Sequence, residues 1–128
     1  MVIVHGIDLV EIASTERLLD APGSHHLKRC FTDQEQTSAG SGFERAAKLS
    51  GRFAAKEAVM KALGTGFGEG IGFLDIEVLT LPSGQPTIKL HREAEAQATK
   101  LGITTWLIST SHEAGFAIAS VIGLAAKC

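Results

Sequence analysis

The feature of this sequence that most constrains the fold is one long alanine-rich segment, residues 43–63, which ends at Gly64. Alanine has the highest helix propensity of the amino acids. Glycine commonly follows the last turn of a helix because it adopts left-handed backbone angles at little cost. The segment therefore predicts a single long helix, and we expect the remaining elements to pack around it.

Short segments rich in β-branched and other apolar residues flank this helix on both sides and predict strands. The predicted strands are residues 2–7, 73–81, 86–91, 104–111 and 115–124. The predicted shorter helices are residues 10–20, a turn or two within 24–31, a helix that begins at the capping box of Thr32 and Glu35, and residues 92–102. Strands that follow one another directly favour antiparallel pairing. This order predicts an α+β fold, a mainly antiparallel sheet packed on the long central helix, in one domain spanning residues 1–128.

The charge balance and the apolar segments argue against several classes of protein. The net charge of −2 lacks the basic excess that attraction to nucleic-acid phosphates requires. No run approaches the roughly 18 apolar residues of a membrane span, and the N-terminal segment lacks the basic region of a signal peptide. Cys30 and Cys128 lack metal-site spacing, which favours two free thiols in a reducing compartment and leaves a single disulfide open. We therefore expect a cytoplasmic protein that binds neither nucleic acid nor membrane.

A glutamate in the long helix is the first candidate functional residue. Glu57 falls on the same helical face as Leu49, Phe53 and Met60, so an inward-packing apolar stripe would carry its carboxylate partly out of water. A buried carboxylate is costly unless it is paired or bound to a metal ion. The alternative is an exposed Glu57–Lys61 pair one turn apart, which contributes a few tenths of a kcal/mol.

A second carboxylate, Asp8, directly follows the first predicted strand, where Gly6 allows a close approach of the backbone. If this strand end meets the middle of the long helix, Asp8 and Glu57 can share one hard cation. Magnesium fits such a pair, because it typically takes one or two protein carboxylates and completes its shell with water and substrate phosphates. The alternative is that Asp8 caps the helix that follows.

Two other segments allow both a structural and a functional interpretation. The glycine run at residues 64–72 follows a helix instead of preceding one, so it is neither a P-loop nor a dinucleotide-binding loop. It indicates a close-approach loop beside Lys61, or plain structure. The hydroxyls and imidazole of residues 109–112, Ser-Thr-Ser-His, can bind phosphate, or His112 is merely exposed at a turn. We expect Trp106, Phe116 and the other phenylalanines in the core.

Three blocks together resemble the holo-[acyl-carrier-protein] synthase family, the small bacterial 4'-phosphopantetheinyl transferases. The blocks are GIDLVEI (6–12), GRFAAKEAVMKALGTG (51–66) and STSHEAGFAIASVI (109–122), in the order of the family. The resemblance covers essentially the whole chain, and its long middle block is highly specific. It implies transfer of 4'-phosphopantetheine from coenzyme A to a serine of apo acyl carrier protein, for fatty acid biosynthesis, by a homotrimer with sites between subunits.

The resemblance also implies roles for individual residues. Asp8 and Glu57 would bind Mg²⁺ with the coenzyme A diphosphate. Glu57, directly or through a metal-bound water, would accept the serine proton, or a water alone would do so. Lys61 would contact the phosphates and neutralise or protonate the leaving 3',5'-ADP. The remaining implied coenzyme A contacts are Arg52, Gly64 and His112.

Carrier recognition is where the chain departs from the family pattern. The family usually places basic residues soon after the GIDLVEI-type block, whereas this chain has Ala13 and Ser14 there. Arg17, Lys28 and Arg29 would grip the acidic carrier instead. Two alternatives to a transferase are a coenzyme A-binding module or inactive relative, and a purely structural oligomer.

Overall fold

A computed structural model describes residues 2–23, 25–65 and 70–125 of the chain. The elements in chain order are β1 (Ile3–Glu11), α1 (Ile12–Asp20), α2 (His26–Cys30), α3 (Asp33–Ser38), α4 (Arg45–Ala62), a 3₁₀ turn η1 (Phe73–Asp75), β2 (Ile76–Thr80), β3 (Pro86–Leu90), α5 (Arg92–Leu101), β4 (Ile103–Glu113) and β5 (Phe116–Ala125). Every predicted helix and strand is present, within a few residues of its expected bounds. The α+β class predicted from the sequence is confirmed.

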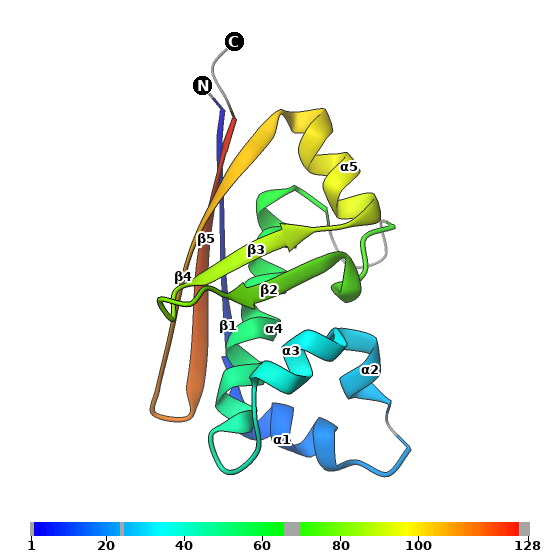
Figure 1. Cartoon of the computed structure of the whole chain (residues 1–128), viewed down its shortest axis with the longest axis vertical. Coiled ribbons are helices and arrows are strands. Elements are labelled where there is room, and N and C mark those ends of the chain that lie inside the picture. The colour runs from blue at the N-terminus through cyan, green and yellow to red at the C-terminus, as the bar shows by residue number, and fades with distance from the viewer. Residues whose placement is uncertain (1, 24, 66–69, 126–128) are drawn as a thin grey trace.

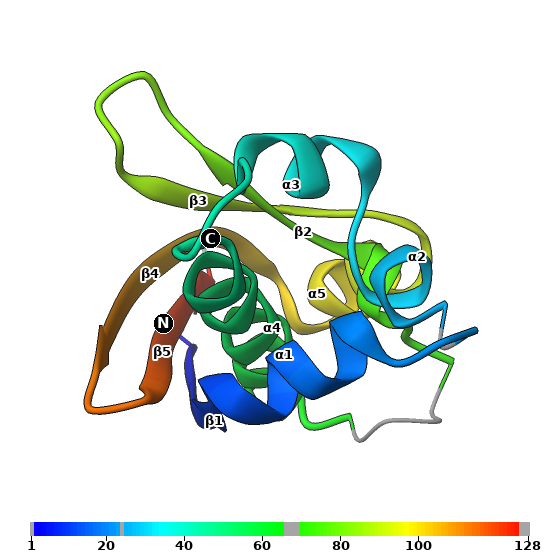
Figure 2. The same cartoon turned by 90° about the horizontal axis from the view of Figure 1, so that it is seen from below.

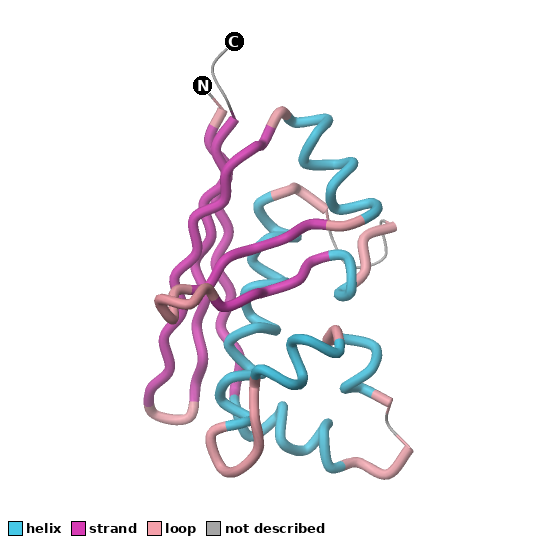
Figure 3. Tube along the Cα trace, in the orientation of Figure 1, coloured by secondary structure: helices cyan, strands magenta, loops and turns pink. Residues whose placement is uncertain are grey.

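The strands form two antiparallel sheets where the sequence suggested one. A long three-stranded sheet has the order β1-β5-β4, and β2 and β3 form a separate two-stranded sheet. The long α4 lies along one face of the three-stranded sheet, while β2 and β3 cross on the other side of the helix (Figure 1, Figure 2). Figure 3 shows the helices gathered on one side of the long sheet. The long helix is therefore central, as predicted.

The first strand is longer than predicted, and this changes the place of Asp8. Strand β1 pairs with β5 along its whole length, from Ile3 opposite Leu124 to Glu11 opposite Phe116. Asp8 therefore lies within the strand, opposite Ala119, and does not cap α1, whose N-cap residue is Glu11. The extension arises because β5 offers a continuous ladder of backbone hydrogen bonds, which local sequence does not reveal.

A glycine sets the distance between β1 and α4. A Cβ atom added to Gly6 would lie 1.8 Å from the carbonyl oxygen of Ala58 and 3.1 Å from the backbone nitrogen of Ala62. The two backbones therefore touch directly, and only glycine fits at this point. Side chains two residues from Gly6 on the same face of the strand consequently lie against α4.

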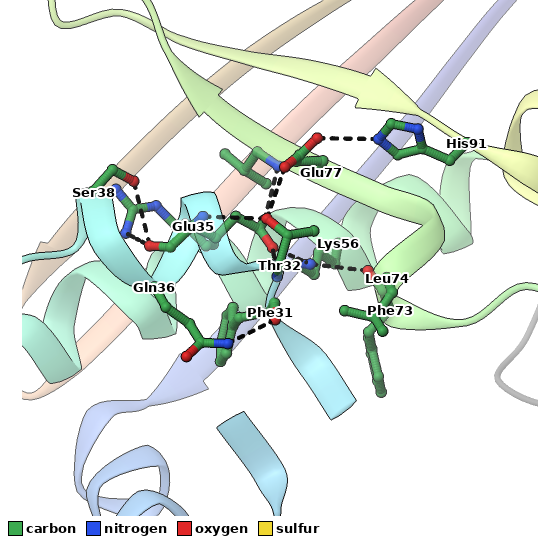
Figure 4. Close-up of polar contacts among 12 residues, drawn as sticks. Phe31, Thr32, Glu35, Gln36, Ser38, Lys56, Phe73, Leu74, Glu77 and His91 are labelled. Atoms are coloured by element: carbon green, nitrogen blue, oxygen red, sulfur yellow. Dashed lines mark hydrogen bonds and ion pairs between the residues drawn. The ribbon is translucent and has the colours of Figure 1, made fainter. Parts of the chain in front are cut away.

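A buried ion pair joins α3, α4 and β2. The side chains of Glu35 and Lys56 are both fully buried, and Nζ of Lys56 donates to Oε1 of Glu35 at 2.7 Å and to the carbonyl of Phe73 at 2.9 Å (Figure 4). The same carboxylate accepts from the backbone N–H groups of Thr32 and Val78 at 2.8 Å each. Burial lowers the pKa of Lys56, and the charge of Glu35 opposes that shift.

The capping box predicted from the sequence is confirmed by the hydrogen bonds between Thr32 and Glu35. The sequence did not reveal that Glu35 also neutralises a lysine of the central helix. A pair of charges held this way is expensive to break, because removal of one partner leaves the other buried and uncompensated. This network fixes α3 against the middle of α4.

Among the described residues, the expectation that the large aromatic residues lie in the core is wrong for Phe43 and Phe116, and Phe67 lies outside the described part of the chain. Phe116 is 43% exposed and Phe43 is 93% exposed, whereas Phe31 is buried and Trp106 is partly buried. Phe116 belongs to an apolar outer face of the three-stranded sheet, on the side away from α4. The exposed large hydrophobic residues of this outer face are Ile3, Ile7, Leu9, Leu107, Phe116 and Ile118.

Replacing Gly6 by Ala should destabilise the fold by about 3 kcal/mol or more, because the new methyl group overlaps a backbone carbonyl that cannot rotate away. Urea unfolding at fixed protein concentration measures the effect. Gly51→Ala is the matched control, since a Cβ there meets nothing within 4 Å. That substitution should leave stability equal or raise it by about 0.5–1 kcal/mol. Equal stability of the two variants would contradict the proposed contact.

Candidate active site

The structure brings Asp8, Glu57 and Lys61 together where β1 crosses the second half of α4. The close approach at Gly6 places Asp8, two residues further along the same face of β1, against this part of the helix. Nζ of Lys61 donates to Oδ1 of Asp8 at 3.1 Å and to the carbonyl of Ile7 at 3.0 Å. The predicted meeting of the two carboxylates is confirmed, although Asp8 reaches it from within a strand.

The carboxylate of Glu57 is half-buried beside a like charge. Burial raises its pKa, Asp8 raises it further by charge and by a side-chain hydrogen bond, and Lys61 opposes the shift. The interpretation of Glu57 as a solvated partner of Lys61 is therefore incomplete. The ion pair that Lys61 forms in the structure is with Asp8.

This cluster suits a hard cation. Its oxygen donors are two carboxylates and the carbonyl of Ile7, and the ammonium group of Lys61 already lies on Asp8 and on that carbonyl. Magnesium prefers such oxygen ligands and needs few from the protein. Within residues 2–23, 25–65 and 70–125, no three His, Cys, Asp or Glu side chains cluster as metal ligands, so any ion here would depend on water or substrate for the rest of its shell.

A second group of predicted residues lines a different hollow. Arg52 and His112 border a cleft of about 320 Å³ between the first half of α4, the end of β4 and the β2–β3 turn. The buried guanidinium of Arg52 donates to the carbonyl of Glu35 at 3.1 Å, and burial lowers its pKa while Glu35 opposes the shift. The cleft also contains the exposed Lys48 and the hydroxyls of Thr110 and Ser111. The positive charges of Lys48 and Arg52, together with these hydroxyls, suit an anion.

The two groups occupy different sides of one molecule. Arg52 and Glu57 are five residues apart on α4, which separates them by about 140° around the helix axis. Asp8 lies on β1 and His112 on β4, the two outer strands of the long sheet. Strands separated by one neighbour are about 10 Å apart. A single chain therefore does not gather all the residues that the sequence assigned to one site.

The remaining predicted residues fall at the periphery. Gly64 follows α4 with a left-handed φ of 74°, as its role as a helix stop requires, and residues 66–69 of the glycine run lie outside the described part of the chain. Arg17 is exposed on α1 and pairs with Glu11 at 3.4 Å. Lys28 and Arg29 are exposed on α2, which packs near α1.

Of the two cysteines, only Cys30 lies in the described part of the chain. Cys30 is buried, and its Sγ lies 3.6 Å from Nδ1 of His26. Burial raises the pKa of this thiol. Cys128 lies outside the described residues.

No helix in the described part of the chain has the length and apolar character to cross a bilayer.

Sequence reasoning missed Lys48 and the Glu35–Lys56 pair. Lys48 and Arg52 are four residues apart in α4, so both lie on one face of the helix. This spacing was the sequence pattern from which Lys48 could have been predicted. No local signal could have paired Glu35 with Lys56, because they are 21 residues apart and belong to different helices.

Comparison with known proteins shows the family to which the chain belongs. Residues 5–119 match the family model described as the 4'-phosphopantetheinyl transferase superfamily. A holo-[acyl-carrier-protein] synthase from Gloeobacter violaceus is 45% identical over 117 residues, covering 91% of this chain and 88% of that protein. One from Alkalilimnicola ehrlichii is 45% identical over 123 residues, covering 95% of this chain and 96% of that protein.

Solved structures of such synthases share the fold. The synthase from Helicobacter pylori, in complex with coenzyme A, superposes with a TM-score of 0.82 at 34% identity, covering 94% of this chain and 99% of that one. The synthase from Bacillus anthracis, in complex with coenzyme A (3',5'-ADP), gives a TM-score of 0.79 at 33% identity and covers 96% of each chain. The fold and the site thus define a small α+β transferase. The chain belongs to the 4'-phosphopantetheinyl transferase superfamily and resembles its holo-[acyl-carrier-protein] synthases.

Replacing Glu57 by Gln should stabilise the metal-free chain at neutral pH. Because the pKa of Glu57 is raised above 4.5, the folded state holds this proton more tightly than the unfolded state does. The ionised form therefore lowers stability at pH 7, and this effect disappears as the pH falls below 4.5. Thermal unfolding in the presence of chelator, measured between pH 4 and pH 8, should give a higher Tm for Glu57→Gln than for wild type. This difference in Tm should become smaller as the pH is lowered. The control Glu16→Gln, on the exposed face of α1, should show no such trend.

Proposed function

We propose that this protein transfers the 4'-phosphopantetheine group of coenzyme A to a serine hydroxyl of apo acyl carrier protein, releasing 3',5'-ADP. The observation that carries the proposal is the contact of Asp8, Glu57 and Lys61 at the β1–α4 crossing, in a chain with this family's fold. Two carboxylates and an ammonium group suit a substrate diphosphate with its cation. The proposed domain spans residues 1–128, and the proposed setting is fatty acid biosynthesis in the cytoplasm.

The residues of this cluster divide the chemical work. Asp8 and Glu57 would hold Mg²⁺, which when bound neutralises the charge of the diphosphate and orients it. The serine oxygen attacks the phosphorus that carries pantetheine, and the bond from that phosphorus to the bridging oxygen of 3',5'-ADP breaks. Glu57, directly or through a metal-bound water, would accept the serine proton. Lys61 neutralises the charge on the leaving 3',5'-ADP.

The cleft of Arg52 and His112 would bind the other end of coenzyme A. Arg52 is held from behind by the carbonyl of Glu35, so its guanidinium is fixed in direction before a ligand arrives. Lys48 supplies a second positive charge, and His112 and its neighbouring hydroxyls supply donors. Such donors suit the nucleotide phosphate of coenzyme A. Gly64 would leave room for the cofactor beside Lys61.

The separation of the two groups of residues supports a homotrimer with sites between subunits. In that arrangement the carboxylate cluster of one subunit faces the Arg52 cleft of its neighbour. The apolar outer face of the three-stranded sheet supplies the contact surface, since six large hydrophobic side chains are exposed there in the single chain. An exposed apolar patch of this kind is typical of protein interfaces.

Carrier recognition is assigned to exposed cations at the end of the molecule formed by α1 and α2 (Figure 1). Lys28 and Arg29 extend from α2 without an ion pair in the described structure, so their charges are available to an acidic partner. Arg17 is engaged by Glu11 and by Ser14, and its contribution would require it to exchange these contacts. We propose that α2 carries more of the carrier contact than α1.

The first experiment is intact-mass analysis of apo acyl carrier protein incubated with this protein and coenzyme A, with Mg²⁺ or with chelator. Wild type should add one phosphopantetheine group only with the metal. Asp8→Asn and Glu57→Gln should each lower the rate by roughly 100-fold or more, because each removes a metal ligand. Glu95→Gln, on the exposed face of α5, is the control and should match wild type.

Coenzyme A binding that requires Asp8 without any transfer to a panel of carriers would favour the second candidate, a binding module or inactive relative. Transfer at wild-type rates by both carboxylate variants would contradict the assignment of Asp8 and Glu57 as metal ligands.

Mixed oligomers test whether the site is shared between subunits. One variant, Lys48→Ala with His112→Ala, alters two exposed side chains of the cleft, and the other, Glu57→Gln, alters the carboxylate cluster. After the two inactive proteins are refolded together in equal amounts, roughly a quarter of the sites should combine an intact cleft with an intact cluster from a neighbour. Recovery of about that fraction of activity supports shared sites. No recovery in a verified mixed oligomer places both groups in one chain.

A further inference from the structure

We propose that Lys61 is the internal counter-ion of Asp8 in the metal-free protein, and that a divalent cation must displace its ammonium group before the site can work. This inference rests on the proposed function and adds to it a coupling between metal and coenzyme A. The displaced ammonium group becomes available to the phosphates of the substrate. One side chain thereby links the two binding events.

The contacts of Lys61 support this role. Its ammonium group lies on two oxygens of β1, Oδ1 of Asp8 and the carbonyl of Ile7, both of which also suit a hard cation. The Asp8 side chain is only 11% exposed, whereas the Lys61 side chain is 57% exposed. The carboxylate is thus fixed by its surroundings, while the lysine reaches it from solvent on a flexible stem. The lysine is the partner that can leave.

The groups in the cluster show why it must leave. The cluster brings together two carboxyl groups, Asp8 and Glu57, and one ammonium group, Lys61, which lies on Oδ1 of Asp8. The residue of β5 opposite Asp8 is Ala119, which brings no charge. A divalent cation on the carboxylates would compete with the ammonium group for the same oxygen of Asp8, and the two cations would repel each other at short range.

The displacement gives metal and coenzyme A binding a positive coupling. A phosphate that attracts Lys61 frees Asp8 for the metal ion, and a metal ion on Asp8 frees Lys61 for the phosphate. The coupling is reciprocal by thermodynamic necessity. The Lys61–Asp8 ion pair also keeps the two carboxylates partly neutralised until substrate and metal are present.

The test compares wild type with Lys61→Met, which keeps an unbranched side chain of nearly the same length and removes its charge. Mn²⁺ binding without coenzyme A, measured by electron paramagnetic resonance, should tighten by roughly two- to fivefold in Lys61→Met, the scale expected when a half-exposed ion pair is no longer in competition. Lys100→Met, which removes an exposed charge from the last turn of α5, should bind Mn²⁺ as wild type does.

A second measurement follows the ammonium group itself. Amine labelling of wild type, read by mass spectrometry, should rise at Lys61 when Mg²⁺ is added and stay constant at Lys100. Labelling of Lys61 in Asp8→Asn should be high from the start. The binding of 3',5'-ADP should be strengthened by Mg²⁺ more in wild type than in Lys61→Met.

The outcomes separate this inference from the proposed function. If wild type binds Mn²⁺ and Lys61→Met binds it no more tightly, or if labelling of Lys61 is unchanged by the metal, the displacement is overturned and the metal site stands. If wild type and Asp8→Asn bind Mn²⁺ equally poorly, the proposed metal site itself is wrong, and the inference fails with it.

Discussion

The constraint on which the rest of this structure depends is the direct contact between the backbones of β1 and α4 at Gly6. A side chain there would overlap the carbonyl of Ala58, so any other residue would push the strand and the helix apart. The strand pitch then fixes Asp8 on the helix-facing side, two residues further along. The position of the candidate metal-binding carboxylates therefore follows from the absence of one side chain.

A second interaction fixes the other side of the helix. The buried Glu35–Lys56 pair joins α3 to the turn of α4 that precedes Glu57, and the carbonyl of Glu35 holds Arg52. The helix is thus held on one side by close backbone packing and on the other by charges sealed from water. A pair of this kind adds little net stability compared with an apolar pair but penalises any misplacement of its members. Such restraint suits a helix with functional groups on two faces.

The candidate site is divided because α4 carries candidate functional groups on two different faces. Glu57 and Lys61 face β1, while Lys48 and Arg52 face the cleft near β4. One small chain cannot fold both faces of a straight helix around one ligand, since the faces point in different directions. In the proposed homotrimer, a neighbour would bring the missing face to each carboxylate cluster, and the apolar outer face of the sheet would supply the surface for that contact.

The sequence by itself determined the type of each element and the α+β class, because helix propensity, capping and periodicity are local properties. Its resemblance to the family made Asp8, Glu57 and Lys61 the candidate site residues. Only the tertiary structure decided that β1 continues through Asp8, that the strands form two sheets, that Phe116 faces outward and that Lys61 pairs with Asp8 and not with Glu57. It alone also paired Glu35 with Lys56 and separated Arg52 from the carboxylates. These features depend on contacts between residues far apart in the chain. Strand pairing and packing create such contacts, and no local pattern encodes them.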